Sequence, residues 1–466
     1  MKQIIKRGSF FTLMFMLLGC LSLYAADNDL ITKQITIKLE EAGTLPDRIA
    51  SSKKYKITNL KIIGEINGTD LRMIREMAGR DYRGKSTDGK LSVLDLSEAK
   101  IVEGADYYCY KHGYYYHTSN DVIGDYAFED CSGLTSLTLP AGITEIGYSA
   151  FFYCYGLTSL TLPAGLTEIG GGAFYGCSGL TSLTLPAGIT EIGESTFSDC
   201  SGLTSLTLPD GITSIGISAF AYCSGLTSLN LPAGITSINY GAFLDCSGLT
   251  SLTLPDGITS IGSRAFYGCS GLTSLTLPAG ITSIGDDTFY GCSGLTSLTL
   301  PAGITSIGEY AFSGCSGLTS LTLPAGITSI DKYAFSGCSR LTSLTLPAGI
   351  TSIGEFAFSY CSGLTSIYVY AEKVPRIGRY AFEGCASRKC TLYVPKGTYD
   401  NYRLSEFGYF ENIVEFDATG IDKTTTSTDV EEVSRYSLNG QRLAVPVKGL
   451  NIVKYSDGSE RKVVVK

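Results

Sequence analysis

Cysteine is the residue type whose spacing in this chain most strongly suggests chemistry. Eleven of the fifteen cysteines recur every 23 residues from Cys131 to Cys361, and in an exported protein this regularity could indicate a disulfide framework. Each of them, however, holds the same place in a repeated phrase. If the copies stack at about 4.8 Å, the Cβ vectors run parallel, whereas disulfide-bonded Cβ atoms lie about 3.8 Å apart. We therefore predict a column of buried free thiols.

Two other cysteines are better placed for a disulfide. Cys385 and Cys390 stand five residues apart in an irregular stretch near the end of the repeats, so they are the alternative candidates for a bond. We expect no metal site in the column, because ligands stacked in one dimension cannot form a tetrahedron.

Both histidines of the protein lie in one aromatic segment. Between Asp106 and Ser119 the chain holds six tyrosines, one cysteine, His112 and His117. Two ligands with no clear third are weak support for a metal site, so the segment is interpreted as a cap loop. The alternative is an aromatic platform for sugars or protein partners, because tyrosine combines a large contact area with a polar tip.

Catalytic groups are not assembled by any motif in the chain. Serine and threonine are abundant, but no histidine lies within a repeat to act as a base, and the sequence has no glycine-rich phosphate loop. We therefore expect a protein that is not an enzyme and that uses no cofactor or metal.

These residues are positioned by a phrase of 23 residues, which occurs in ten full copies between Leu134 and Gly363. A period of this length with leucine at the first, fourth and sixth positions is typical of a leucine-rich-repeat solenoid. The fold class expected is α/β: a right-handed solenoid of parallel strands with caps at both ends and a small β tail domain.

The cleanest copy, LTSLTLPAGITSIGEYAFSGCSG, begins at Leu295. Its alternation predicts a strand that points Leu298 and Leu300 inward. Pro301 should end the strand, with proline at the second and glycine at the fourth position of a turn. A second short extended piece should follow. Ala311, Phe312 and Cys315 then fall at a one-turn helical spacing and should also face the core.

The ends of the chain predict further domains. Residues 1–26 fit a secretory signal peptide, in which Cys20 is an alternative site of lipidation. Residues 27–120 should form an N-terminal cap, with a helix capped by Thr69 or Asp70, and residues 121–395 should form the solenoid. Residues 396–420 should form a C-terminal cap, 421–435 a linker, and 436–466 a β domain with alternating strands and turn dipeptides.

Charge and hydropathy exclude several partners. The formal charge of −8 would become −11 without residues 1–26, which hold three basic and no acidic residues. Such a chain is a poor partner for nucleic acid or anionic membranes. Beyond the leader, no stretch reaches the roughly 18 apolar residues of a membrane span, so no integral segment is expected in the mature chain.

Several segments resemble one family. EINGTDLRMIREMAG, LDLSEAKIVEG and DVIGDYAFEDCSGLTSLTLP resemble the BspA-like leucine-rich-repeat surface proteins of bacteria. The resemblance implies a secreted or outer-surface protein that attaches to host matrix proteins or other surface proteins, with glycans as a further candidate, and it implies no catalytic residues. The tail is similar to the C-terminal sorting domains of Bacteroidetes secretion systems.

Comparison of the copies separates a uniform face from a variable one. The outward strand positions are almost always serine and threonine, while large side chains vary beside the Ala-Phe pair. An aromatic and charged stripe is typical of recognition surfaces, although solvated residues free to vary would look alike. The candidate ligand-binding residues are Tyr240, Tyr267, Tyr290, Tyr310 and Tyr333. The favoured function is adhesion; the alternatives are a surface spacer without a ligand, a glycan-binding module, and a binder of ice or crystalline polymer.

Overall fold

The computed structural model describes residues 29–104 and 106–418 and, in the tail, residues 432–437, 442–443, 449–455 and 460–465. The chain divides into two compact units, the first ending at Phe416 and the second beginning at Asp417. The expected signal peptide (1–26) with Cys20 and residues 421–431 of the expected linker lie outside the described residues.

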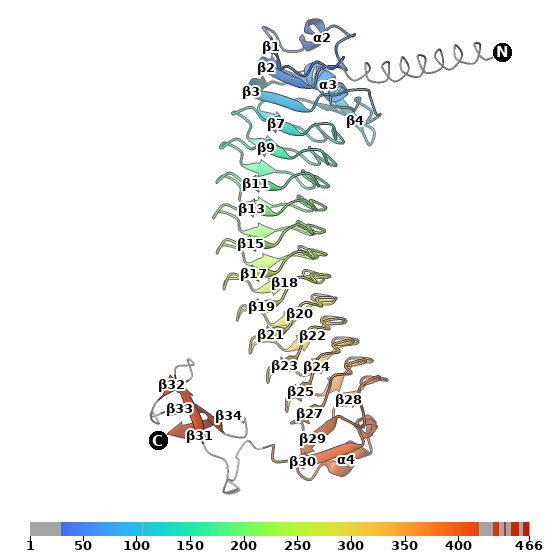
Figure 1. Cartoon of the computed structure of the whole chain (residues 1–466), viewed down its shortest axis with the longest axis vertical. Helices are drawn as coiled ribbons and strands as arrows, with labels where there is room; N and C mark the ends of the chain where they lie inside the picture. The colour runs from blue at the N-terminus through green and yellow to red at the C-terminus, as the bar shows by residue number, and fades with distance from the viewer. Residues whose placement is uncertain are drawn as a thin grey trace, which may run out of the picture. The chain divides into compact units, whose positions relative to one another are not determined.

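The first unit is a stack of coils, each formed by one 23-residue copy (Figure 1). Every coil contributes a strand from the Ser-Leu-Thr part and a shorter strand that ends at the second isoleucine, and both kinds run parallel to their counterparts in neighbouring coils. Leu298, Leu300, Ile304 and Ile307 are all buried, as predicted. The expected parallel-strand solenoid is confirmed.

The longer strands form the strand face of the stack. They are β7 (Ser136–Thr138), β9 (Ser159–Thr161), β11 (Ser182–Thr184), β13 (Ser205–Thr207), β15 (Ser228–Asn230), β17 (Ser251–Thr253), β19 (Ser274–Thr276), β21 (Ser297–Thr299), β23 (Ser320–Thr322), β25 (Ser343–Leu346) and β27 (Ser366–Val369). The shorter strands are β6 (Val122–Ile123), β8 (Glu145–Ile146), β10 (Glu168–Ile169), β12 (Glu191–Ile192), β14 (Ser214–Ile215), β16 (Ser237–Ile238), β18 (Ser260–Ile261), β20 (Ser283–Ile284), β22 (Ser306–Ile307), β24 (Ser329–Ile330), β26 (Ser352–Ile353) and β28 (Arg376–Ile377).

The turn after each longer strand begins one residue later than expected. The Ile304 N–H donates to the Pro301 carbonyl over 3.2 Å, so proline takes the first and glycine the third position of the turn. The predicted placement was wrong because Leu300 is still part of the buried strand face. The chain cannot reverse until the side chain of Leu300 has entered the core.

The segment with the expected helical spacing is a series of turns. The Cys315 N–H donates to the Phe312 carbonyl within the coil, but the Phe312 N–H donates to Ala334 of the next coil over 2.7 Å. An α-helix would need both amides for its own ladder. Tyr310 and Gly314 also have left-handed φ values of 54° and 74°, which interrupt a helix. We call this side of the coils the turn side.

The turn side carries the core that continues through every coil. One phenylalanine from each coil is buried in a single column from Phe128 to Phe382, with successive ring centroids 5.1–5.7 Å apart. The column cysteines lie beside it, and each thiol from Cys154 to Cys361 donates to a phenylalanine carbonyl in the preceding coil; Cys315 reaches Phe289 over 3.1 Å. The described cysteines are free and buried, which confirms the predicted thiol column.

The strand face, in contrast, is interrupted. Its strands pair as β7–β9, β11–β13, β15–β17 and β19–β21, with breaks between these pairs, before pairing becomes continuous from β23 to β27. The Thr204 amide bonds to Thr181 over 2.9 Å within a pair, whereas the described structure has no equivalent bond between Thr227 and Thr204 across a break. Later breaks keep only a longer bond, 3.4 Å from Thr273 to Thr250 and 3.3 Å from Thr319 to Thr296. The identical Ser-Leu-Thr phrase therefore forms both closed and open steps.

The N-terminal cap extends the strand face through β1 (Ile35–Lys38), β2 (Asn59–Ile66) and β3 (Val93–Ile101), because β3 pairs with β7. It also holds α2 (Leu45–Arg48), α3 (Gly68–Met77) and a hairpin of β4 (Tyr107–Lys111) and β5 (Tyr114–His117). The expected cap of α3 was wrong: Asn67 caps the helix, and the Asp70 carboxylate accepts the Asn67 N–H. Asp70 therefore occupies the third helical position of a capping box.

The C-terminal cap contains β29 (Thr391–Pro395), α4 (Tyr399–Arg403), the 3₁₀ helix η1 (Glu406–Tyr409) and β30 (Asn412–Phe416), with β29 and β30 closing the sheet. Cys385 and Cys390 are both free, so the alternative disulfide is wrong. The Cys385 thiol continues the column by donating to Phe358 over 3.2 Å, which commits its side chain to the core.

The second unit is described through its strands alone. They are β31 (Glu432–Ser437), β32 (Arg442–Leu443), β33 (Gly449–Tyr455) and β34 (Glu460–Val465), and they form an antiparallel sheet in the order β32–β31–β33–β34.

We predict that Phe266→Ala lowers the free energy of unfolding by about 3–5 kcal/mol, because Phe266 is fully buried between Phe243 and Phe289 and nothing adjacent can fill its place. Urea denaturation measures the change. The exposed Ser274→Ala is the control and should stay within about 0.5 kcal/mol of the parent. An unchanged midpoint in Phe266→Ala would contradict the phenylalanine column.

Burial gives the thiol column a pH dependence. It raises the pKa of Cys292 from 9.0 to about 12, so above pH 9 the thiol ionises in the unfolded chain but not in the folded one, and stability is lost. The Cys292→Ala variant lacks this pH-dependent loss. The free energy of unfolding that the substitution removes, measured by urea denaturation, should therefore be about 1.4 kcal/mol smaller at pH 10 than at pH 8. Ser274→Ala should cost the same at both values. If Cys292→Ala lowers the free energy of unfolding equally at pH 8 and pH 10, or if the thiols of the native protein are labelled rapidly at pH 8, the burial of the thiols is contradicted.

Candidate functional site

Four of the five candidate tyrosines form a continuous row along the turn side. Tyr267 and Tyr290 stack with ring centroids 4.7 Å apart and an interplanar angle of 10°. Tyr290 meets Tyr310 edge-on at 6.3 Å, and Tyr310 stacks on Tyr333 at 4.6 Å. All four rings are half-buried, so each presents one part to solvent and rests the other on its neighbours. Tyrosines of four successive coils thus share one surface.

The row continues beyond the predicted residues. Tyr333 stacks on Phe356 at 4.8 Å, and Phe356 contacts Tyr380 at 5.2 Å. We call the row from Tyr267 to Tyr380 the aromatic edge. Tyr380 was not among the candidates, although it precedes Ala381-Phe382 as Tyr310 precedes Ala311-Phe312. Extending the repeat alignment by one degenerate copy would have found it.

Tyr240 lies apart from the aromatic edge. It is 42% exposed, and its hydroxyl accepts a hydrogen bond from Arg264 Nη1 over 2.9 Å. The Nε of Arg264 donates to Asp287 over 3.1 Å. Tyr240 therefore belongs to a polar chain of three residues on three successive coils, and the described structure shows no ring contact between it and the other four candidates.

Aromatic residues stand on the edge despite an unfavourable backbone. Tyr310, Tyr333, Phe356 and Tyr380 have φ values between 54° and 58°, a region that favours glycine. Such a conformation costs roughly 1–2 kcal/mol for a residue with a Cβ atom. Stacking with neighbouring rings offsets part of this cost, since an aromatic pair contributes about 0.5–1.5 kcal/mol beyond its buried area.

The edge is neutral in itself and has charged neighbours. Partial burial raises the pKa of Tyr267 and Tyr310, so both phenols stay protonated at physiological pH. Asp286 and Glu309 flank the rings on the adjoining strand ends, and the Asp286 carboxylate accepts the backbone N–H of Glu309 over 2.9 Å. Lys332 precedes Tyr333 and lies 3.9 Å from the Glu355 carboxylate, so the surface combines large apolar contacts with charges of both signs.

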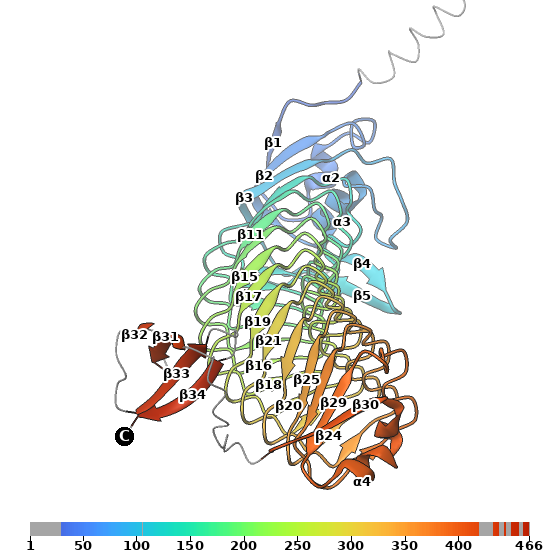
Figure 2. The ribbon, with the colours of Figure 1, turned by 60° about the horizontal axis from the view of Figure 1, so that its bottom comes forward.

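The segment with both histidines forms the β4–β5 hairpin, which projects from the side of the cap (Figure 2). His112 and Gly113 make its tight turn with positive φ values, and Tyr114 is 70% exposed. His112 faces the ring of Tyr126 and His117 that of Tyr107, with centroids 6.0 and 6.4 Å apart. The histidines lie at opposite ends of the hairpin, while its tyrosines cluster.

The strand face has a feature that its monotonous sequence did not predict. At its C-terminal end, Tyr368 of β27 stacks on Tyr393 of β29 at 4.4 Å, and Phe416 of β30 meets Tyr370 edge-on at 5.1 Å. This strand-face patch arises because outward positions of the last strands hold tyrosine in place of serine or threonine.

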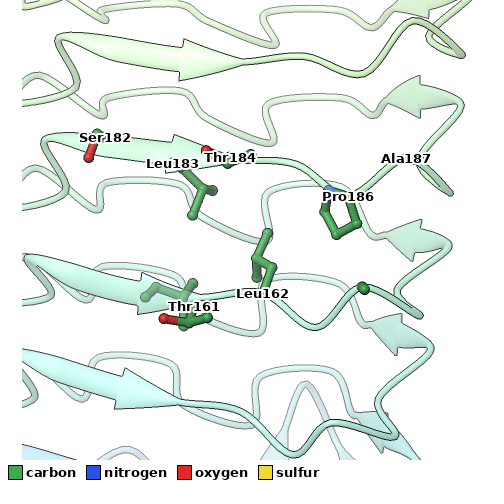
Figure 3. A pocket seen from close by; sticks show the side chains of 9 residues that line it. Thr161, Leu162, Ser182, Leu183, Thr184, Pro186 and Ala187 are labelled. Atoms are coloured by element: carbon green, nitrogen blue, oxygen red, sulfur yellow. The ribbon is translucent and has the colours of Figure 1, made fainter.

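Shallow hollows open at the breaks in the strand face. One of about 520 Å³ lies between β9 and β11, and Figure 3 shows its walls: Thr161 and Leu162 from one coil, and Ser182, Thr184 and Pro186 from the next. Similar hollows lie between β17 and β19 and between β21 and β23. They contain small side chains and no aromatic anchor.

The described residues contain no group of three or more His, Cys, Asp and Glu side chains arranged to hold a metal ion. None of their helices combines the length and the apolar character needed to cross a membrane.

Comparison with known proteins identifies the family of the repeats. The family model described as "BspA type Leucine rich repeat region (6 copies)" matches residues 121–250, 213–340 and 282–402, which together make up more than half of the chain. No curated protein matches the sequence.

Among solved structures, the chain is similar to a leucine-rich repeat protein from Bacteroides ovatus, with 26% identity over 65% of this chain and 90% of that chain and a TM-score of 0.49. It is also similar to a leucine rich cell surface protein from Faecalibacterium prausnitzii, with 28% identity over 58% of this chain and 86% of that chain and a TM-score of 0.39. On the extent of the family match, this chain belongs to the BspA-type leucine-rich-repeat family.

Proposed function

We propose that the protein is a bacterial surface adhesin that binds partner proteins through its aromatic edge. The observation that carries the proposal is the unbroken contact of six aromatic rings from Tyr267 to Tyr380. Recognition surfaces depend on a few large anchors, among which tyrosine is enriched. Membership of a leucine-rich-repeat family fits a role in protein interaction.

The edge is a better candidate than the strand face. Four aromatic residues occupy left-handed positions that most other coils fill with small or polar residues such as Gly172 and Ser218, and one coil with Arg264. Stacking alone offsets only part of that cost, and strained positions tend to cluster at functional sites. The middle of the strand face offers serine, threonine and Asn230, with some threonine hydroxyls already bonded to the preceding coil, as for Thr204 to Thr181.

The surface location belongs to the same proposal. Residues 1–26 would direct export, with lipidation at Cys20 as the less favoured alternative, and the antiparallel tail sheet would act as a sorting or anchoring domain. The domain scheme of cap, solenoid (121–395), cap, linker (421–435) and tail (436–466) serves this arrangement. Partners would be host matrix proteins or other surface proteins.

Three alternatives compete with adhesion. A spacer without a ligand needs no aromatic edge. A glycan-binding module is favoured by one observation, the stacked and half-buried rings of Tyr368 and Tyr393 in the strand-face patch. A binder of ice or crystalline polymer needs a flat regular lattice, whereas the breaks and the bend of the stack disturb the Ser-x-Thr rows (Figure 1).

Four substitutions to serine test the edge: Tyr267→Ser, Tyr290→Ser, Tyr310→Ser and Tyr333→Ser, combined in one variant. Serine occupies the equivalent positions in other coils, for example Ser313 and Ser218, so the backbone accepts it. Binding to the partner found in an array of matrix proteins and glycans should fall at least about 30-fold, because the loss of even two anchors worth about 1 kcal/mol each gives this factor.

The matched control replaces Ser251, Ser274 and Ser297 on the strand face with alanine and should bind as the parent does. Circular dichroism melts establish that both variants are folded. If the serine-to-alanine variant loses binding while the tyrosine variant keeps it, the strand face is the site and the aromatic edge is not.

A further inference from the structure

The aromatic edge ends at a pocket between the last coil and the C-terminal cap. The pocket has a volume of about 380 Å³ and a mostly apolar lining. Ile377 and Phe382 belong to the last coil, while Tyr409 belongs to η1 of the cap. Tyr380, the final ring of the edge, forms part of the wall.

The aromatic walls are held in place from behind. The Tyr409 hydroxyl donates to the Cys385 carbonyl over 2.9 Å, so its ring has a fixed position although it is 43% exposed. Phe382 is buried in the phenylalanine column 5.5 Å from Phe358 and makes a rigid part of the lining. Tyr380 is 53% exposed and contacts Phe356.

Two carboxylates complete the lining. Glu383 and Glu406 both border the pocket and are exposed. Neither side chain makes an ion pair or hydrogen bond within the described parts of the chain, unlike Glu411, which pairs with Arg388 over 2.9 Å. Their charge is therefore available to a ligand.

We propose that this pocket binds an arginine side chain of a partner protein. The apolar lining suits the methylene stem, the faces of Tyr380 and Tyr409 suit the planar guanidinium, and Glu383 and Glu406 suit its fork of N–H donors. The chain already shows this preference: the guanidinium of Arg379 lies 5.4 Å from the centre of the Tyr380 ring. Lysine fits less well, because its ammonium is compact and strongly hydrated.

This inference rests on the proposed adhesion and gives the partner a chemistry. The pocket stands at the end of the aromatic edge, so one extended segment of a partner could lie along the rings and place an arginine at the end. A formal net charge of −8 also favours partners with a basic surface.

The test uses the full chain and the peptide acetyl-Gly-Arg-Gly-amide, with binding measured by saturation-transfer NMR. The arginine methylenes should receive saturation from the protein. The same peptide with citrulline, which has the shape of arginine without its charge, should give at least about fivefold less signal. Glu383→Gln with Glu406→Gln should reduce the arginine signal to a similar extent.

The control variant is Glu168→Gln with Glu194→Gln, which removes two exposed carboxylates from early coils and so changes the net charge equally. It should bind the peptide as the parent does. Equal signals for arginine and citrulline, or equal losses in the two double variants, would overturn the proposal, because either would show attraction without a specific pocket.

The experiments can contradict either proposal without contradicting the other. The variant with four tyrosines of the edge replaced by serine leaves Tyr380 and Tyr409 in place, so it should still bind the arginine peptide. If the peptide binds the parent but the edge variant keeps its partner, adhesion through the edge fails and the pocket stands. If partner binding depends on the edge but the Glu383/Glu406 variant binds the peptide normally, the pocket inference fails alone.

Discussion

The structure depends on a mismatch between two ways of stacking identical coils. On the turn side, the amide of one phenylalanine per coil bonds to the next coil over 2.7–2.9 Å at every step from Phe128 to Phe358. The buried rings there advance by 5.1–5.7 Å, whereas paired strands lie about 4.8 Å apart. Pairing on the strand face is interrupted between β9 and β11, β13 and β15, β17 and β19, and β21 and β23, although the turn-side bonds are kept at every one of these steps.

This mismatch makes the two surfaces unequal. The strand face is broken at alternate steps in its middle part, and its hollows hold small side chains. The outer turn side keeps short steps, with stacked rings 4.6–4.8 Å apart from Tyr310 to Phe356. A partner would therefore meet a continuous aromatic surface on one side and an interrupted polar one on the other. The bend of the stack follows from steps that differ across the coil.

The sequence predicted what depends on the repeat alone and missed what depends on neighbours. Inward Leu298, the buried thiols and the shared row of Tyr267 to Tyr333 followed from period and position. The alternate pairing could not be predicted, because Ser-Leu-Thr is the same at closed and open steps. The bond from Arg264 of the next coil to the Tyr240 hydroxyl could not be predicted either, because it depends on which residue the neighbouring coil places there. The pocket at Tyr380 forms only where the cap meets the last coil.

Amide hydrogen exchange, resolved by residue, measures the central mismatch most directly. Phenylalanine amides of the turn side, such as Phe220 and Phe243, should be protected in every coil. On the strand face, Thr181 and Thr227, whose amides face a break, should exchange at least about tenfold faster than Thr204 and Thr250, whose amides bond within a pair. Equal protection of all four threonines, or weaker protection on the turn side than on the strand face, would contradict the account.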